Sequence, residues 1–253
     1  IKLNCGIICS KGGFMNKTYI YIIIAVFLAL VVQPNISVKL KETIRIPENQ
    51  GETLMTNDTV DLKSSESKAT ICIDPAYGGV DSGFVSQGKT DSKDITLNLA
   101  LIIGDTLKQS GYNVVYTRID DSINFYKNEE ENANYRINIA KDQKADYLLR
   151  IELNSNSDPL EKGYTIFTQP NDSLIDLSNE IAQNLMQINY SEFKGLDSDH
   201  YGNFPILADS DLSTIFIEFG YVSNPSDYSQ MSDIEYQKKI ASAIAKAFLN
   251  KIN

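Results

Sequence analysis

Residues 69–79 read ATICIDPAYGG, and this stretch decides the fold class. The apolar and β-branched run from Ala69 to Ile73 predicts a buried strand, because such residues favour a pleated surface covered on both sides. Pro75 cannot donate to a sheet, so Asp74-Pro75 predicts the exit of the chain from that strand. Two glycines follow at 78 and 79, and they predict a turn with positive φ that Tyr77 would not adopt.

Downstream of this strand, apolar periodicity predicts strands and helices in alternation. The expected strands cover residues 113–117, 146–153, 163–167 and 214–219, and the expected helices cover 94–109, 132–142, 173–188 and 233–252. Alternation of this kind is typical of an α/β sandwich, in which a mostly parallel twisted sheet is flanked by helices in three layers. We therefore expect a single α/β domain over residues 70–253.

The residues before this domain predict export. The chain of 253 residues begins with Ile1, and Met15 directly precedes Asn16-Lys17, so residues 1–14 are interpreted as an over-extended start. Residues 15–33 contain the uncharged apolar run from 19 to 32, which predicts a signal anchor or a signal peptide. A polar linker over 34–69 follows. The expected protein is exported and either secreted or tethered to a membrane through residues 16–32.

Composition excludes two classes of function. The formal charge is −10 and the isoelectric point is near 4.7, which argues against a nucleic-acid partner. His200 is the only histidine, so a metal site that needs two imidazoles cannot be assembled within one chain. Cys72 lies in the apolar strand and is expected to be an inert core thiol.

Four segments at the predicted strand ends and helix starts carry the polar residues of interest. Chemistry in such sheets collects at the carboxyl ends of the strands. The four segments are Asp74-Pro75-Ala76-Tyr77-Gly78-Gly79, Thr90-Asp91-Ser92-Lys93-Asp94, Arg150-Ile151-Glu152-Leu153-Asn154 and Ile217-Glu218-Phe219-Gly220-Tyr221-Val222-Ser223-Asn224.

In order and spacing, these segments resemble the catalytic domain of type 3 N-acetylmuramoyl-L-alanine amidases. These are zinc hydrolases that cut the lactyl amide between glycan and stem peptide in peptidoglycan. The resemblance covers residues 70–252 and implies peptidoglycan or a cell-wall protein as partner. The family motifs are Asp-Pro-Gly-His-Gly-Gly, Glu-Lys-Asp, Ser-Ile-His with Asn two residues later, and Glu-x-Gly-Phe with Ser-Asn.

The resemblance also shows what this chain has replaced. The family's three zinc ligands are the first histidine, the glutamate and the second histidine, and Tyr77, Ser92 and Glu152 stand at their positions. Glu218 matches the family's general base. A tyrosine phenol must lose a proton with a pKa near 10 to bind zinc, so no metal and no other cofactor is expected.

Removing a dication while adding Glu152 leaves carboxylates that face one another without a counterion. Arg150 lies two residues before Glu152 and therefore on the same face of the sheet. We expect Arg150 to supply the lost positive charge by pairing with Glu152 or Glu218, with the Tyr77 hydroxyl bonded into the same cluster. The alternative is that Arg150 points to solvent and Glu152 is protonated.

Two functions from different classes follow. The first is a metal-free pseudoenzyme with an amidase fold that binds peptidoglycan or a cell-wall protein. The second is a working cell-wall hydrolase with a non-standard site. That site is either a Glu152/Glu218 carboxylate pair or a metal held by oxygen ligands, with Asp91 or Asp94 beside these two glutamates.

Overall fold

A six-stranded sheet forms the centre of the domain. The structure is a computed structural model that describes residues 68–85, 90–124, 126 and 128–252. The strand order is β2-β1-β3-β6-β4-β5. The strands are β1 (Lys68–Pro75), β2 (Tyr112–Tyr116), β3 (Tyr147–Asn154), β4 (Tyr164–Thr168), β5 (Phe193–Asp197) and β6 (Ser213–Tyr221).

The sheet is mostly parallel, which confirms the expected fold class. β1 pairs in parallel with β2 and β3, β3 pairs in parallel with β6, and β4 pairs in parallel with β5. The one antiparallel pairing among these strands joins β4 to β6. Because β1, β3 and β6 are parallel neighbours, their carboxyl ends meet at one edge of the sheet.

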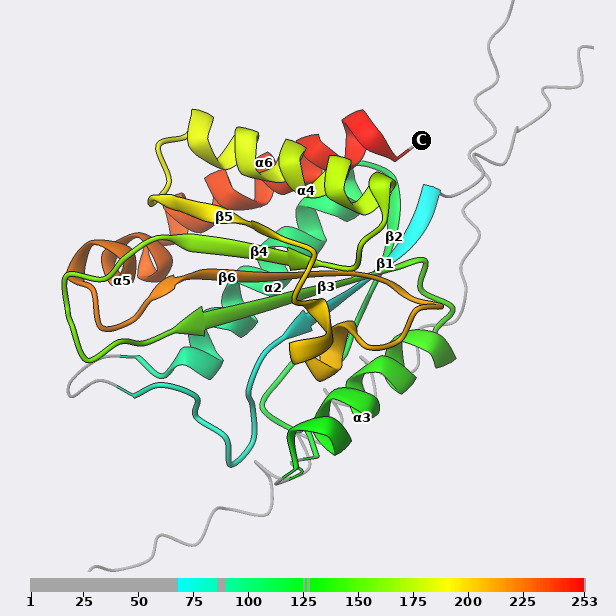
Figure 1. Cartoon of the computed structure of the whole chain (residues 1–253), viewed down its shortest axis with the longest axis horizontal. Helices are drawn as coiled ribbons and strands as arrows, with labels where there is room; N and C mark the ends of the chain where they lie inside the picture. Colours follow the sequence, from blue (N-terminus) through cyan, green and yellow to red (C-terminus); the bar gives the residue numbers. More distant parts are fainter. Residues whose placement is uncertain (1–67, 86–89, 125, 127, 253) are drawn as a thin grey trace, which may run out of the picture. The chain divides into compact units, whose positions relative to one another are not determined.

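Helices cover both faces of this sheet (Figure 1). α2 (Ser92–Gln109), α4 (Asp172–Gln187) and α6 (Ile234–Lys251) pack on one face, and α3 (Glu129–Asp142) packs on the other beside the short turn η2 (Pro205–Leu207). Another short turn, η1 (Tyr201–Asn203), precedes η2, and α5 (Pro225–Ser232) follows β6. The arrangement is the predicted three-layer sandwich.

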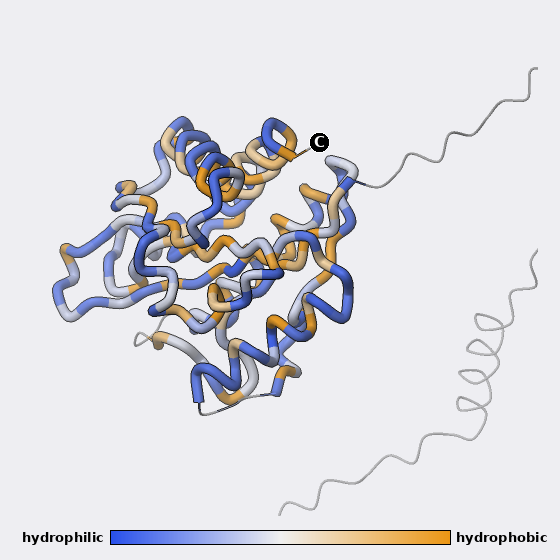
Figure 2. The backbone as a smooth tube through the Cα atoms, turned by 45° about the vertical axis from the view of Figure 1, so that its right-hand side comes forward, coloured by the Kyte–Doolittle hydropathy of each residue, from blue (hydrophilic) through white to orange (hydrophobic). Residues whose placement is uncertain are grey.

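Each face has its own hydrophobic core, and strand alternation assigns residues to them. Ile71 and Ile73 are buried against α2, whereas Cys72 between them is buried in the core under α3. Burial raises the pKa of the Cys72 thiol, and this residue is a free cysteine. In Figure 2 the central strands are largely hydrophobic, while the helices alternate between hydrophobic and hydrophilic residues along their turns.

Helix starts differ from the sequence-based boundaries where capping acts. α3 begins at Glu129 rather than 132, because the Asn128 side chain accepts hydrogen bonds from the backbone N–H groups of Glu130 and Glu131. Three glutamates in the first turn then suit the positive end of the helix dipole. Apolar periodicity does not predict this first turn of α3, because the turn contains no apolar residue.

Apolar periodicity predicts no element between residues 219 and 233, yet a helix forms there after β6. Asn224 caps α5 by accepting from the N–H groups of Ser226 and Asp227, and Pro225 occupies the first helical position. β5 was also missed; it lies at the edge of the sheet and contains a lysine, a glycine and an aspartate.

The predicted N-terminal segments fall outside the described residues. These are the over-extended start (1–14), the signal anchor or signal peptide (15–33) and the linker up to residue 67. β1 begins at Lys68, so the last two residues of the expected linker belong to the strand. Within residues 68–85, 90–124, 126 and 128–252, no helix has both the length and the apolar character needed to cross a bilayer.

Candidate functional site

The carboxyl ends of β1, β3 and β6 bring four charged side chains onto one face of the sheet. In the strand register Asp74 is opposite Arg150, and Glu152 is opposite Glu218. These residues alternate with Ile73, Ile151 and Ile217, which face the core under α2, α4 and α6. The four charged side chains therefore point toward the α3 side. The order of the strands, and not proximity in sequence, assembles this cluster.

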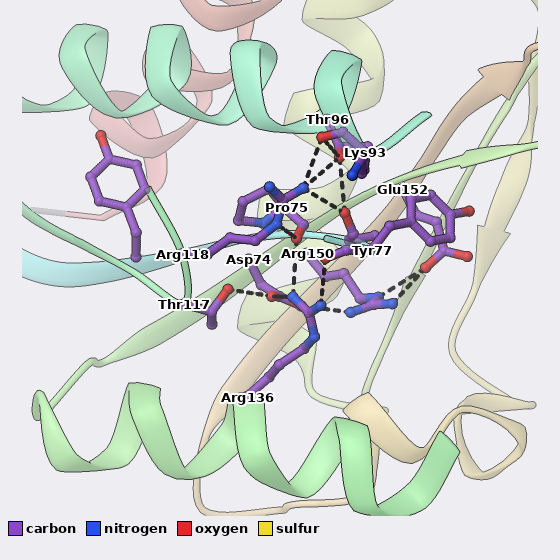
Figure 3. A network of polar contacts seen from close by, with 12 residues as sticks. Asp74, Pro75, Tyr77, Lys93, Thr96, Thr117, Arg118, Arg136, Arg150 and Glu152 are labelled. Atoms are coloured by element: carbon purple, nitrogen blue, oxygen red, sulfur yellow. Dashed lines mark hydrogen bonds and ion pairs between the residues drawn. The ribbon is translucent and has the colours of Figure 1, made fainter. Parts of the chain in front are cut away.

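Arg150 lies between two carboxylates (Figure 3). Its Nη1 is 2.6 Å from Asp74 Oδ2, and its Nη2 and Nε are 2.8 and 3.0 Å from Glu152 Oε2. The guanidinium carbon also lies 5.7 Å from the centre of the Phe216 ring, at cation–π distance. Burial lowers the pKa of Arg150, but the charges of Glu152 and Asp74 outweigh burial and raise it. The guanidinium is therefore permanently charged in this position.

Asp74 is the buried acceptor at the base of the cluster. Its side chain has no exposed surface, and Arg136 of α3 donates to Oδ1 at 2.5 Å, as does the Thr117 hydroxyl. Burial by itself raises the pKa of this carboxyl. The positive charges of Arg136 and Arg150 lower the pKa by more than burial raises it, so that it is about 2. Arg136 also donates to the backbone carbonyls of Pro75 and Tyr77, which fixes the chain after β1.

Tyr77, at the position of the first family ligand, is bonded to the backbone. Its hydroxyl donates to the carbonyl of Leu153 at 2.6 Å. Burial raises the pKa of the phenol, and the charge of Glu152 raises it further. The phenol is thus held in its protonated form, and a protonated phenol is a poor ligand for zinc.

The backbone of Tyr77 corrects one expectation. Its φ is +64°, in the left-handed region that the sequence analysis reserved for Gly78 and Gly79, which also have positive φ. A non-glycine residue pays for this conformation with about 1 kcal/mol or more. Gly83 covers the ring so closely that a Cβ there would lie 2.6 Å from it, and the Arg136 bond to the Tyr77 carbonyl holds the turn.

Ser92, at the position of the second family ligand, is engaged elsewhere. It is fully buried at the start of α2, and its hydroxyl donates to the Phe84 carbonyl at 2.9 Å. Its neighbour Lys93 forms an ion pair with Asp121 at 2.6 Å. These contacts tie the start of α2 to the loops that follow β1 and β2.

Glu218, at the position of the family's general base, has a neutral partner. The side-chain amide of Asn154 donates to its Oε2 at 3.0 Å. Burial raises the pKa of Glu218, and the neighbouring charge of Glu152 raises it further, while the Asn154 bond opposes this. Among the ion pairs of the described residues, none includes Glu218.

The residues at the three ligand positions do not fit zinc. A protonated phenol, a hydroxyl that donates to a backbone carbonyl and a carboxylate bound by a guanidinium replace the imidazole and carboxylate donors that zinc prefers. In the described part of the chain, no three His, Cys, Asp or Glu side chains are placed to hold a metal ion. Asp91, Asp94, Glu152 and Glu218, the set considered for an oxygen-ligated metal, belong to this described part.

The single histidine takes no part in the cluster on Asp74. His200 is exposed, and its Nδ1 lies 2.9 Å from Asp197 Oδ2 in the turn after β5. This ion pair raises the pKa of the imidazole.

A small cavity of about 100 Å³ opens beside the cluster. Its wall combines acidic, basic and apolar side chains from β3, β6, α3 and the segment around η2. The lining residues are Glu129, Asn132, Ala133, Arg150, Glu152, Phe204, Pro205, Ile206, Phe216 and Glu218. Buried Asn132 Oδ1 has no hydrogen-bond partner within the described residues.

Sequence reasoning gave no role to Arg118 and Arg136, although both are part of the framework. Arg118 donates to the backbone carbonyls of Pro75, Ala76 and Lys93. Burial lowers the pKa of Arg118 to about 10, with a further contribution from Arg136. The signal for Arg136 was its place among Ala133, Ile137 and Ala140, the buried face of α3.

Comparison with known proteins assigns the domain that carries this site to a family. The sequence profile of the N-acetylmuramoyl-L-alanine amidase family matches residues 71–250. The uncharacterized protein YqiI of Bacillus subtilis (strain 168) is 31% identical over 178 residues, which cover 69% of this chain and 81% of YqiI. The amidase LytC of the same organism is 28% identical over 186 residues, 72% of this chain and 35% of LytC, so this chain matches only about a third of LytC.

A solved structure agrees with the match. An N-acetylmuramoyl-L-alanine amidase of Nostoc punctiforme superimposes with a TM-score of 0.62 at 27% identity, covering 72% of this chain and 96% of that protein.

Proposed function

The chain belongs to the N-acetylmuramoyl-L-alanine amidase family, and we propose that it is a member that binds peptidoglycan without hydrolysing it. LytC and the Nostoc punctiforme protein are N-acetylmuramoyl-L-alanine amidases, and a relative of Staphylococcus aureus, LytH, is a probable cell wall amidase. This chain has the family fold and a cavity at the carboxyl ends of β3 and β6, while the residues at the ligand positions have other partners.

The contact between Arg150 and Glu152 carries this proposal. Zinc would lower the pKa of a bound water and polarise the amide carbonyl, and Glu218 would then move protons. In this chain a guanidinium supplies positive charge beside Glu152 instead. A guanidinium has no vacant orbital for a water molecule and does not lose a proton near neutral pH. Glu218 alone therefore has no activated nucleophile to assist.

We also propose that the protein works outside the cytoplasm, tethered or secreted through residues 16–32. The support is the apolar run at 19–32 and the cell-wall substrate of the family. At this location a cell-wall protein is a second class of partner, beside peptidoglycan.

A digest of purified peptidoglycan tests the proposal. The full chain should release no peptide above the buffer blank, should match its Glu218→Gln variant, and should sediment with the insoluble wall. An active family amidase serves as the positive control for release. Peptide release that Glu218→Gln abolishes would show a working hydrolase with a non-standard site, and failure to sediment would remove the binding role.

A further inference from the structure

The outer face of α6 is basic in a chain that is acidic overall. The charged residues of this helix are one acid, Glu235, and four lysines: Lys238, Lys239, Lys246 and Lys251. All five side chains are exposed, whereas the whole chain has a formal charge of −10. Because helical residues three or four apart share a face, Lys238, Lys239 and Lys246 form one stripe with Ser242 between them. This stripe is a local positive region on a negative protein.

A groove between α4 and α6 contains the same three lysines. The two helices lie side by side on one face of the sheet (Figure 1), and the groove between them has a volume of about 350 Å³. Its charged lining residues are Glu235 and the three lysines of the stripe. The wall from α4 and the residue after it is neutral, with Asn184, Gln187 and Ile188. The lining therefore has three positive charges and one negative charge.

Two of these lysines have no acidic partner among the described residues. The ion pair between Lys238 and Glu235, at 2.7 Å, uses the one acid of the groove. The Nζ of Lys239 lies 4.9 Å from the centre of an aromatic ring, and Lys246 donates to the neutral amide oxygen of Gln187 at 3.2 Å. The groove thus has two exposed positive charges that no carboxylate of the described chain compensates.

We infer that this face of α6, with the groove beside it, lies on the surface of a membrane that contains anionic lipids. A cluster of about four or more lysines on an amphipathic helix is typical of such a contact. The opposite face of α6 is buried in the core of the domain, so the lysine face is the one open to a partner. Lipid phosphates would lie beside Lys239 and Lys246. Leu249, an exposed apolar side chain seven residues after Ser242, would contact the interfacial region.

The point where the chain enters the domain supports this placement. The Nζ of Lys68, at the start of β1, lies 5.1 Å from the centre of the Tyr112 ring. The Tyr112 hydroxyl in turn donates to the carbonyl of Ile252, directly after α6. The domain that follows the proposed tether therefore begins beside the end of α6. The inference rests on the proposed location of the protein at a membrane, and not on whether the protein cuts the wall.

The same placement orients the site. α4 and α6 cover one face of the sheet, whereas Asp74, Arg150 and Glu152 lie on the face that α3 covers. A membrane contact through α6 would leave these three residues and their cavity directed away from the bilayer, toward the wall. The acidic remainder of the domain is repelled by anionic lipids, which favours the same orientation.

A proximity measurement on the full chain tests this inference. A fluorophore is attached to Ser242→Cys, with Cys5 and Cys9 replaced by serine and buried Cys72 left in place. The chain is mixed with vesicles that carry a quencher on their head groups and consist of phosphatidylcholine, with or without phosphatidylglycerol. Quenching should be about twofold or more stronger with phosphatidylglycerol, and the difference should shrink in salt of about 0.5 M. A label at Asn138→Cys, exposed on α3, should show no such difference.

Paired lysine variants show whether the charge of the groove is responsible. Lys239→Gln combined with Lys246→Gln should remove the effect of phosphatidylglycerol on the Ser242→Cys label. Lys144→Gln combined with Lys162→Gln is the matched control, because it removes the same charge from exposed positions outside α4 and α6. Circular dichroism checks that each variant is folded. Equal quenching of the labels on α6 and α3, or an effect that survives loss of the groove lysines, would overturn the inference.

Flotation of the same samples separates this inference from the proposed tether. If the chain floats with both kinds of vesicle and phosphatidylglycerol does not increase quenching on α6, the inference fails and the tether stands. If it floats only with phosphatidylglycerol, and only when the groove lysines are present, the tether fails and the inference stands. Flotation with neither contradicts both. If inorganic polyphosphate binds through the groove lysines and phosphatidylglycerol has no effect, the partner is a soluble polyanion and the inference is overturned.

Discussion

The guanidinium of Arg150 lies 2.6 Å from the carboxylate of Asp74, a side chain with no exposed surface. This contact crosses from β3 to β1, and the other side of the same guanidinium meets Glu152. In the family motifs, the position of Asp74 lies three residues before the first zinc ligand, and the position of Glu152 is itself that of a zinc ligand. The permanently charged guanidinium of Arg150 therefore lies where the family motifs place the residues around the zinc ion.

Replacement of Arg150 should destabilise the fold strongly. Arg150→Met leaves Glu152 and one oxygen of Asp74 without their cation, and breaking a buried pair in this way costs about 3 kcal/mol or more. Urea unfolding at pH 7 measures the change. Lys141→Met is the control, because the Lys141–Asp209 pair on the surface contributes about 1 kcal/mol or less. Equal losses in the two variants would contradict the role given to Arg150.

Asp74 should link stability to acid. Its pKa is about 2 in the folded chain against an ordinary value of 3.8. A lowered pKa means that the stabilisation is complete well above pH 3.8 and is lost as the pH falls toward 2. The difference in pKa corresponds to about 2 kcal/mol. Asp74→Asn should therefore lose at least this amount at pH 7, and the loss should shrink near pH 2.

The measurement is a series of urea unfolding curves between pH 2 and 7. Asp176→Asn, at an exposed position on α4, should show no such dependence. A penalty for Asp74→Asn that stays constant across this range would refute the linkage.

Glu218→Gln should make the protein more stable at neutral pH. Burial and Glu152 raise the pKa of Glu218, so the fold favours its neutral form. The penalty for ionising it is absent below its ordinary pKa and grows as the pH rises through the raised pKa. Glutamine is always neutral and still accepts a hydrogen bond from Asn154. The melting temperature should rise at pH 7 and not at pH 3.5, and Glu180→Gln should show no such gain.

Gly83→Ala should loosen the loop over Tyr77. A Cβ at Gly83 would lie 2.6 Å from the tyrosine ring, and the residue has a φ of +64°. Both effects are unfavourable and together cost about 2 kcal/mol. Gly202→Ala is the control, because a Cβ there meets nothing within 4 Å. If the two variants melt at the same temperature, Gly83 does not hold the ring in place.

Zinc binding should return only when Arg150 is removed together with the other changes. Tyr77→His, Ser92→Glu and Glu152→His restore the three family ligands, Arg150→Ser restores the serine of the third family motif, and Glu218 is already present. The fourfold variant should bind about one zinc per chain, because it has the three donors that such sites use. The threefold variant that keeps Arg150 should bind less, because a guanidinium beside the site repels the ion. Equal metal content in the two would show that Arg150 has no such effect.

Much of the fold could be predicted from apolar periodicity, and the exceptions have physical causes. The strands β1, β3 and β6 are buried on both faces, so their apolar runs are clear in the sequence. β5 lies at the sheet edge, and its residues are exposed or half-buried. α5 has eight residues, and its start depends on the Asn224 cap and Pro225 rather than on a hydrophobic face.

The candidate site could be predicted in part. Residue spacing places Arg150 and Glu152 on one face of a strand, and the structure brings them together. The contact with Asp74 depends on the order and register of β1 and β3, which a single sequence does not reveal. The Tyr77 hydroxyl was expected to be bonded into this cluster; it donates to the Leu153 carbonyl, and it also interacts with Glu152 of the cluster.

The zinc content of the full chain tests the central claim most directly. After equilibration with zinc and removal of free metal by gel filtration, elemental analysis should find far less than one zinc per chain, in the wild type and in His200→Gln alike. One tightly held zinc per chain that persists in His200→Gln would contradict the account, because the chain would then hold zinc without the family's imidazole ligands.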